Sequence, residues 1–283
     1  MDPRLLTPLD EPVLDRFLAS HRDSSMFLRA NARRAGLAYR GQPFQAIYVA
    51  AFEDDKIIGV AAHCWNGLLL VQAPEQTAGL TRACVEWSGR SVTGLSGPLD
   101  QVRLARSALG LAGAQAAREG DEWLYALDLT DLVVPAALSS GTIVCRAPRH
   151  EERDVLCQWR LAYDIETLGA IDSVEHRRRS ADFLDTQIAN GDVWVAVDAG
   201  TLVSLSAFNA TLPDIVQLGG IYTPPDLRGR GYAKAAVAAS LLAARDRGAS
   251  RAVLFTSNPS AARTYEALGF RRAGDYSLVL LKE

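Results

Sequence analysis

The most constraining feature of this sequence is a glycine-rich turn that joins a predicted strand to a predicted helix. The strand covers Asp214–Tyr222 and is interrupted by the pair Gly219 and Gly220, which suggests a β-bulge or a close backbone approach. After the turn, small apolar residues recur at helical spacing. Gly229 and Gly231 place backbone without side chains where the helix begins, and the N–H groups and dipole of a helix start favour an anion. The turn therefore predicts a phosphate-binding site.

Two well-known phosphate-binding turns do not fit this segment. A P-loop needs G-x-x-x-x-G-K-[ST], which the sequence lacks. A dinucleotide-binding turn needs a third small residue where Lys234 stands, and a carboxylate about 20 residues further on, which is also missing. The pattern that fits is Arg-x-x-Gly-x-Ala, filled by Arg228, Gly231 and Ala233.

A second segment supports a cofactor site. Asn258 and Pro259 suit the start of a helix, since asparagine caps the first turn and proline fits inside it. Tyr265 lies on this helix, which Gly269 ends. The two segments, R-x-x-G-x-A and N-P-x-A-x-x-x-Y-x-x-x-G-F, resemble the two motifs of the GCN5-related N-acetyltransferase (GNAT) family in their order and spacing.

The resemblance implies a reaction and a set of site residues. GNAT enzymes transfer an acetyl group from acetyl-coenzyme A to an amine by direct attack, without a covalent enzyme intermediate. The pantetheine arm enters a gap where a bulged strand splays from its parallel neighbour. By motif position, Tyr265 is the tyrosine that protonates the leaving thiolate. The positions that correspond to the coenzyme-binding segments are Ile221, Tyr222, Thr223, Arg228, Gly229, Arg230, Gly231, Tyr232, Ala233 and Asn258.

The sequence indicates the general base less clearly than it indicates these residues. Asp164 and Glu166 fall at the end of a predicted helix over 155–168, in the region that forms the acceptor side of GNAT folds. Either could accept a proton directly or through water. Charged side chains at a helix end are usually solvated, and we expect this for both carboxylates. We expect the same for the basic run at 176–179.

The chain contains two copies of one plan of helices and strands. The resemblance predicts an α/β protein of two tandem GNAT-like domains, each a mixed, mainly antiparallel sheet flanked by helices with a splayed strand pair. We place a first domain at 1–135 and a catalytic domain at 141–283. The segment between them contains a proline and ends in Ser-Ser-Gly, which is typical of a linker. We expect a strand over 123–129 to close the first copy and one over 276–281 to close the second.

The first copy departs from the cofactor motif. Its corresponding turn runs from Gln76 to Thr81, and a threonine stands where the motif requires glycine or alanine. The helix that follows opens with Gly97-Pro98 instead of Asn-Pro and carries no tyrosine. We therefore expect a degenerate amino-terminal domain, kept as a scaffold or to close the acceptor cleft.

Charge, hydropathy and cysteine spacing narrow the class of protein. A formal net charge of -3 offers no support for a nucleic-acid partner. No apolar stretch approaches the roughly 20 residues that cross a bilayer, and the amino terminus lacks a secretory signal, so we expect no membrane association and a cytoplasmic location. Cys64, Cys84, Cys145 and Cys157 lack metal-site spacing, which predicts no metal and reduced thiols.

The resemblance to GNAT proteins implies an acetyl-CoA-dependent N-acetyltransferase that acts on a primary amine of a small molecule or peptide. An alternative is a non-catalytic acyl-CoA-binding sensor or interaction module, which would keep the coenzyme grip without the chemistry. A dinucleotide-binding enzyme is a third interpretation. The sequence leaves the acceptor, and the choice between monomer and homodimer, open.

Overall fold

A computed structural model describes residues 3–282 and divides the chain into two compact units. Among the described residues, the first unit contains 3–124 together with 273–282, and the second contains 125–272. The predicted division at 135–141 therefore does not match the compact units, because the linker lies within the second unit and the last strand belongs to the first.

The first unit is a sheet with two pairs of helices. Its elements in chain order are β1 (Arg4–Leu5), α1 (Glu11–Ser20), α2 (Met26–Ala35), β2 (Ala46–Glu53), β3 (Lys56–Cys64), β4 (Leu68–Gln72), α3 (Thr77–Ser88), β5 (Gly94–Pro98), α4 (Leu99–Ala108), most of β6 (Ala116–Asp128) and most of β12 (Arg271–Leu281). Neighbouring strands follow the order β1-β2-β3-β4-β5-β12. All of these pairs are antiparallel except β4 with β5, which is parallel.

The chain's last strand completes this first sheet. Tyr276 pairs with Pro98, and the register continues to Leu280 opposite Gly94. The prediction that residues 276–281 close the second copy is therefore wrong, because their backbone hydrogen bonds are made to β5. Several apolar side chains of β5 and β12 share one core, since Leu95 and Val279 belong to the same buried cluster.

The second unit repeats the plan. Its elements are α5 (Ala136–Ser139), β7 (Ile143–Arg146), α6 (Arg153–Leu168), α7 (Val174–Ala189), β8 (Val193–Asp198), β9 (Thr201–Thr211), β10 (Ile215–Tyr222), α8 (Tyr232–Asp246), β11 (Arg251–Thr256) and α9 (Pro259–Glu266). Its sheet order is β6-β11-β10-β9-β8-β7, in which residues 125–128 of β6 belong to this unit. The β10–β11 pair is parallel, whereas β7, β8, β9 and β10 pair antiparallel.

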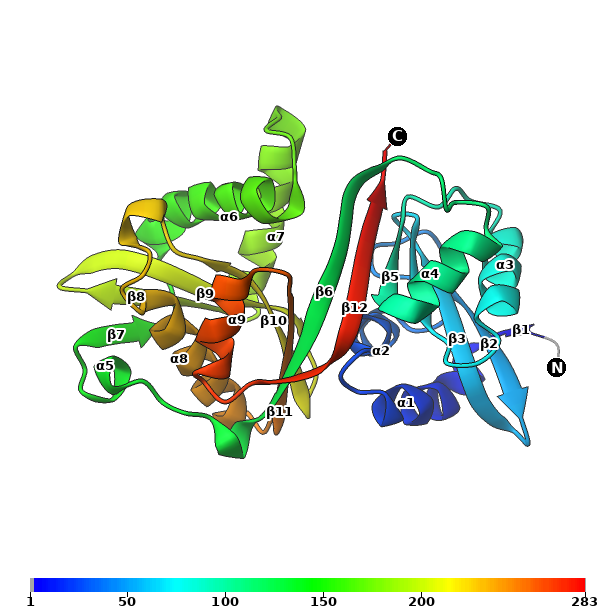
Figure 1. Cartoon of the computed structure of the whole chain (residues 1–283), viewed down its shortest axis with the longest axis horizontal. Coiled ribbons are helices and arrows are strands. Elements are labelled where there is room, and N and C mark those ends of the chain that lie inside the picture. Colours follow the sequence, from blue (N-terminus) through cyan, green and yellow to red (C-terminus); the bar gives the residue numbers. More distant parts are fainter. Residues whose placement is uncertain (1–2, 283) are drawn as a thin grey trace. The chain divides into compact units, whose positions relative to one another are not determined.

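Helices cover both faces of this second sheet (Figure 1). Leu156 of α6 and Leu184 of α7 pack on one face against Val195 and Leu205 of the strands. On the other face, Ala235 and other small residues of α8 let that helix lie close to β8 and β9. The mixed, mainly antiparallel α/β architecture predicted from the sequence is thus observed.

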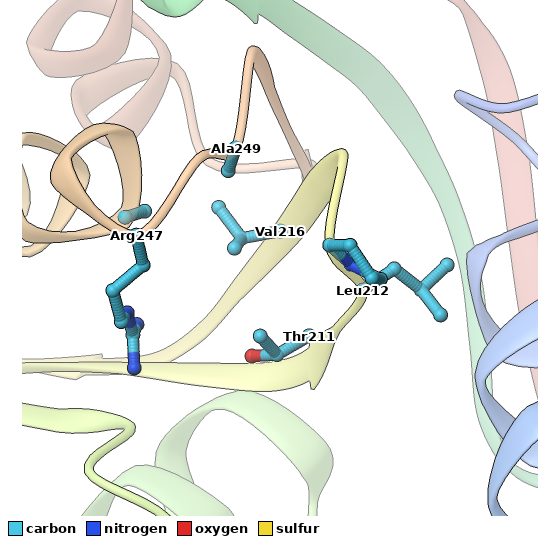
Figure 2. A pocket seen from close by; sticks show the side chains of 7 residues that line it. Thr211, Leu212, Val216, Arg247 and Ala249 are labelled. Carbon is cyan, nitrogen blue, oxygen red and sulfur yellow. The ribbon is translucent and has the colours of Figure 1, made fainter.

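An open pocket lies beside the turn between β9 and β10 (Figure 2). Thr211, Leu212 and Val216 line it together with Arg247 and Ala249, which follow the end of α8. The pocket is at the start of β10, so it is separate from the glycine turn that follows the end of this strand.

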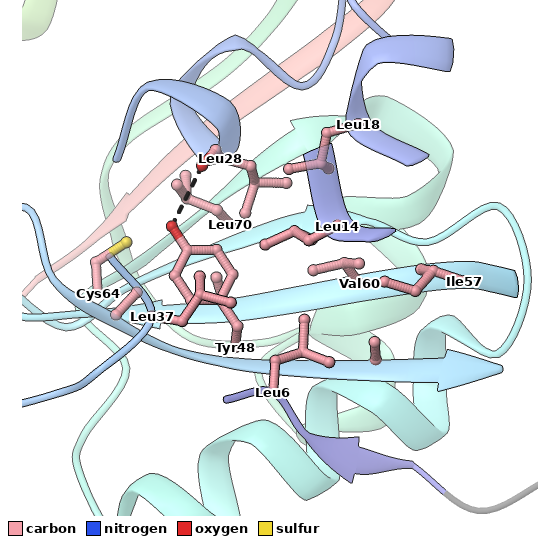
Figure 3. Packing of buried hydrophobic residues seen from close by; sticks show 13 residues of the cluster. Leu6, Leu14, Leu18, Leu28, Leu37, Tyr48, Ile57, Val60, Cys64 and Leu70 are labelled. Atoms are coloured by element: carbon pink, nitrogen blue, oxygen red, sulfur yellow. Dashed lines mark hydrogen bonds between the residues drawn. The ribbon is translucent and has the colours of Figure 1, made fainter. Parts of the chain in front are cut away.

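The α1–α2 face of the first unit has a dry core around Tyr48 (Figure 3). The Tyr48 hydroxyl donates a 3.2 Å hydrogen bond to the Leu28 carbonyl oxygen, which satisfies the one polar atom that this side chain buries. Leu14, Leu18 and Val60 pack around the ring. The first copy is therefore a fully packed unit with its own core.

Candidate functional site

Strand β10 parts from β11 halfway along its length. Their parallel pairing runs from Ile215 opposite Arg251 to Gln217 opposite Val253 and then stops, although both strands continue. On its other edge, β10 shifts register against β9 between Gly219 and Tyr222. The structure therefore contains the bulge and the splayed strand pair predicted from the paired glycines.

Both glycines of the bulge are required by their surroundings. A Cβ atom at Gly219 would lie 1.9 Å from the Asn209 side-chain nitrogen, which no real contact allows. Gly220 has a φ of +68°, a left-handed conformation that glycine adopts without strain. A Cβ at Gly220 would also approach Nη1 of Arg160 to 3.0 Å. The bulge thus brings bare backbone close to two polar side chains.

The turn after β10 opens a cradle of backbone N–H groups. Gly229 and Gly231 have φ values of +78° and +82°, and a Cβ at either would meet nothing within 4 Å. Gly231 is the N-cap of α8 and its carbonyl accepts the first helical bond, from Ala235. Within residues 3–282, no N–H from Gly229 to Lys234 donates a hydrogen bond. Unpaired donors at a helix start are an arrangement that favours an anion.

The two arginines of the turn are held differently. Arg228 donates from Nε to the Thr223 carbonyl at 2.9 Å and from Nη2 to Glu166 at 2.7 Å. Arg230 donates to the carbonyl of Asp226 at 3.2 Å. The Arg228–Glu166 pair is exposed by 49% and 43% of its side chains, so the pair is open to exchange with another anion.

The end of β10 is fixed by one serine from β9. Ser204 donates to the Tyr222 carbonyl at 2.9 Å, and its hydroxyl lies 2.8 Å from that of Thr223. Tyr222 is buried and packs near Trp159, whereas Ile221 is partly exposed at the bulge. The predicted residues 221–223 thus border the gap through their backbone.

Three other predicted residues lie at the starts of the two flanking helices, α8 and α9. The Tyr232 hydroxyl donates to the Asp198 carboxylate, so its side chain is engaged and only its N–H remains for a ligand. Ala233 follows in the first turn of α8. Asn258 is the N-cap of α9, and its Oδ1 accepts from Ser260 at 2.8 Å and from Ala261 at 3.3 Å. Its role in the structure is therefore to begin the helix that carries Tyr265.

Tyr265 projects from α9 into a buried position. The residue is 8% exposed, and its ring meets Phe270 edge-on at 6.0 Å. Its hydroxyl makes no hydrogen bond within the part of the chain that the structure describes. Burial, with a smaller contribution from nearby Tyr163, raises the pKa of the Tyr265 phenol well above its usual value. The phenol therefore keeps its proton at neutral pH and has a free donor.

One carboxylate at the end of α6 is buried, which corrects the expectation that both are solvated. Asp164 is 3% exposed, and its Oδ2 accepts from the Ser180 hydroxyl and lies 3.4 Å from Nε2 of His176. Its Oδ1 lies 3.0 Å from Nε of Arg160. Glu166, in contrast, is exposed as expected and contacts Arg228. Asp164 therefore belongs to a buried polar cluster with Arg160, Ser180 and His176, and His176 is one member of the basic run at 176–179.

The signal for this cluster was present in the sequence. Leu156, Arg160 and Asp164 follow one another at intervals of four residues and are the buried positions of α6. Charged residues that continue an apolar stripe point to a polar site in the core. Asp164 continues this stripe and is therefore buried, although it lies near the end of the helix.

The corresponding gap of the first unit is closed. There, Gln101 of α4 accepts a 2.6 Å hydrogen bond from the Ala73 N–H, which directly follows β4. The β4–β5 pairing also ends after three pairs, at Leu70 opposite Ser96, but a Cβ at Gly97 of β5 would lie 2.4 Å from the Val71 carbonyl oxygen of β4, so these strands are still close one residue later. The equivalent turn begins at Gln76, a non-glycine residue with a φ of +59°. The first copy thus has a glutamine side chain bound at the end of β4 and a turn that starts with a side chain instead of a glycine.

Residues 3–282 contain neither a membrane-spanning helix nor a cluster of metal ligands. No helix of this part of the chain is long and apolar enough to span a bilayer. No group of three or more histidine, cysteine, aspartate or glutamate side chains there could hold a metal ion.

Sequence comparison finds a family match within the second unit. The family model described as "Acetyltransferase (GNAT) family" matches residues 156–270. A probable N-acetyltransferase family 8 member 5 of Mus musculus is 38% identical over 96 residues, which are 31% of this chain and 42% of that protein. N-acetyltransferase family 8 member 2 of Rattus norvegicus is 35% identical over 101 residues, 33% of this chain and 45% of that protein. The chain spans less than half the length of these relatives.

Solved structures share the fold over the whole chain. A GCN5-related N-acetyltransferase from Kribbella flavida has a TM-score of 0.60 at 16% identity and covers 93% of this chain and 95% of its own. One from Sphaerobacter thermophilus has a TM-score of 0.59 at 19% identity, with 98% and 94% covered. A tandem GNAT protein from the clavulanic acid biosynthesis pathway has a TM-score of 0.53 at 16% identity, with 100% and 98% covered. These likenesses show that the chain shares the fold of GNAT proteins, and the match to the family model covers residues 156–270 of the second unit.

Proposed function

We propose that this protein transfers an acetyl group from acetyl-coenzyme A to a primary amine, and that its second unit does so. The observation that carries the proposal is the coincidence of two open features at the end of β10. The parallel strands part after Gln217, and the backbone N–H groups of Gly229 to Lys234 have no partner in the described chain. A thioester arm fits the first feature and a pyrophosphate fits the second.

The turn suits a pyrophosphate in shape and in charge. The free space in front of Gly229 and Gly231 lets phosphate oxygens approach the backbone N–H groups without meeting a side chain. Arg228 supplies a positive charge at the same turn, and its exposed partner Glu166 can be displaced. The predicted coenzyme-binding residues 228–233 would therefore act mainly through backbone donors and the helix dipole.

The gap beside β10 suits an extended pantetheine arm. The unpaired edge of the strand after Gln217 presents backbone groups that an extended chain can use as a neighbouring strand would. Ile221, Tyr222 and Thr223 border this edge, and Ser204 holds the Tyr222 carbonyl in place. Bound acetyl-coenzyme A supplies the activated thioester that an amine can attack.

Tyr265 would act at the leaving sulfur. Its hydroxyl is protonated at neutral pH because burial raises its pKa, and the hydroxyl is free to donate. A general acid within hydrogen-bond reach of the departing thiolate can protonate it as the bond to the acyl group breaks. Asp164, with its side chain fixed by Ser180, is the buried carboxylate best placed in this unit to accept the proton of the amine.

Only the second unit would bind the coenzyme. In the first, Gln101 already accepts from Ala73 N–H, at the end of the corresponding strand, and the strands remain in contact at Gly97. A pantetheine arm would have to displace both. The first unit therefore has the family's plan without its binding gap.

Coenzyme release tests the proposal. We would measure free thiol formation from acetyl-coenzyme A with a panel of primary amines, using the wild type and Tyr265→Phe. We expect turnover with at least one amine, and a fall in kcat of about 10²-fold or more in the variant. Acetyl-coenzyme A should raise the melting temperature of both proteins equally.

The same experiment separates the alternatives. A protein that acetyl-coenzyme A stabilises, but that acetylates no amine, would be an acyl-CoA-binding sensor. A protein stabilised by NAD instead would be a dinucleotide-binding enzyme. Stabilisation by neither ligand would refute the proposed function.

A further inference from the structure

A buried arginine beside the bulge has unused hydrogen-bond donors. Arg160 is 9% exposed, yet Nε and Nη1 find no acceptor within residues 3–282. An arginine carries donors in a rigid planar fork and is always charged. Leaving such a group buried without acceptors destabilises the folded protein, so the arrangement calls for a function.

The guanidinium is held in place without using its donors. Its carbon atom lies 4.7 Å from the ring centre of Phe183 and 5.3 Å from that of Tyr163. These cation–π contacts fix its position. Nη1 lies against Gly220, where a Cβ would come within 3.0 Å. The donors are therefore presented at the bulge, next to the proposed thioester gap.

Asp164 balances the charge of Arg160 but does not satisfy its donors. Oδ1 of Asp164 and Nε of Arg160 are 3.0 Å apart, but their geometry is too poor for a hydrogen bond, and both atoms have no partner among the described residues. The Ser180 hydroxyl donates to Oδ2 and so sets the orientation of the carboxylate, whereas Nε2 of His176 lies 3.4 Å from Oδ2 without a hydrogen bond. A cationic donor group and an anionic acceptor atom thus lie side by side, each with unused capacity.

We propose that this cluster is the acceptor site and that the acceptor is an amine bearing a carboxylate, which Arg160 binds. Nη1 and Nη2 form the edge of the guanidinium that a carboxylate matches with two oxygens, and neither donates a hydrogen bond within residues 3–282. The free Oδ1 of Asp164 suits the positive amine of the same molecule. A phosphate dianion fits less well, because Asp164 leaves the site with no excess positive charge. The inference rests on the proposed function, since it names the acceptor class of that transfer.

Matched pairs of amines test the inference. We would compare amino acids and dipeptides with their carboxamides, measuring coenzyme release by the wild type, Arg160→Lys and Arg153→Met. We expect at least one pair in which the wild type prefers the carboxylate about tenfold or more in kcat/KM, mainly through KM. Arg160→Lys keeps the positive charge, which supports the fold, but loses the planar pair of guanidinium donors. The variant should therefore lose most of the preference for the carboxylate over the carboxamide.

Arg153→Met is the matched control. Arg153 begins the same helix and pairs with Asp185 at 2.6 Å, away from the bulge, so its loss should leave the preference unchanged. The preference should also appear in melting temperature: with saturating acetyl-coenzyme A, the carboxylate of a favoured pair stabilises the wild type, whereas its carboxamide does not.

The inference and the proposed function can fail separately. If no pair shows a carboxylate preference in either assay, or if the preference survives in Arg160→Lys, the acceptor assignment is overturned. Acetylation of carboxamides as fast as of carboxylates would have this result and leave the transfer reaction standing. Absence of stabilisation by acetyl-coenzyme A would instead count against the transfer reaction itself.

Discussion

The glycine cradle can be tested by adding one methyl group at the start of α8. Gly231→Ala places a side chain at a φ of +82°, where the new Cβ meets no atom within 4 Å. The cost to folding is then the left-handed conformation alone, about 1–2 kcal/mol. For a unit of this size we expect the melting temperature to fall by roughly 2–8 °C.

Gly248 provides a matched control at the other end of the same helix. It has a φ of +100°, and a Cβ there also meets nothing within 4 Å. Gly248→Ala should therefore cost a similar folding free energy. Only at Gly231 does the methyl group enter the space in front of the unpaired N–H groups. Charge-assisted hydrogen bonds to phosphate contribute about 1.5–3 kcal/mol each, so losing one weakens coenzyme binding about tenfold or more.

The assay is calorimetric titration of coenzyme A into the wild type and the two variants, with a thermal melt of each. We expect both variants to melt lower and only Gly231→Ala to bind more weakly. Equal coenzyme affinity in the two variants would refute the cradle. A loss of affinity in both would show that strain in α8, and not the added methyl group, controls binding.

Three further predictions concern other parts of the chain. Glu166→Gln removes the competitor for Arg228, so the affinity for acetyl-coenzyme A should rise roughly two- to fivefold with kcat unchanged; a large fall in kcat would instead make Glu166 the base. Gln101→Ala leaves the Ala73 N–H without its acceptor and should cost about 1–3 kcal/mol in urea unfolding, whereas an unchanged midpoint would show that the gap of the first unit is not sealed by this bond. Burial raises the pKa of the Cys84 thiol to about 12, against about 8.5 in an unfolded chain. Because the unfolded chain loses its proton first, stability should fall as pH rises above about 8.5. Urea unfolding at pH 8 and pH 10 should show a smaller fall in Cys84→Ala, and parallel falls would argue against this origin.

The local chemistry of the candidate site could be predicted from the sequence. A glycine can adopt a positive φ without strain, so Gly220, Gly229 and Gly231, which do adopt one, indicated the bulge and the turn without tertiary information. Asn258 and Pro259 marked the start of α9 for a similarly local reason. The order of the helices and strands, and the repetition of one plan, followed from hydrophobic periodicity.

The pairing between strands that are distant in the sequence could not be predicted from the sequence. The pattern of residues 276–281 specifies a strand, but hydrogen bonds to either copy would satisfy that strand equally. Its pairing with β5 depends on which sheet edge is free when the chain folds. The sequence boundary between the two domains was misplaced for this reason.

What the sequence alone determined is the set of positions where the backbone must be special, together with the family that those positions resemble. What only the tertiary structure decided is which side chains meet across the site. Arg160 and Asp164 lie on α6, Ser180 on α7 and Gly220 on β10, and no local pattern joins them. Burial is a property of the packed unit, because the free energy of a charged group depends on what surrounds it in space. The difference between a solvated helix end and an acceptor site therefore appears only when the helices pack on the bulged strand.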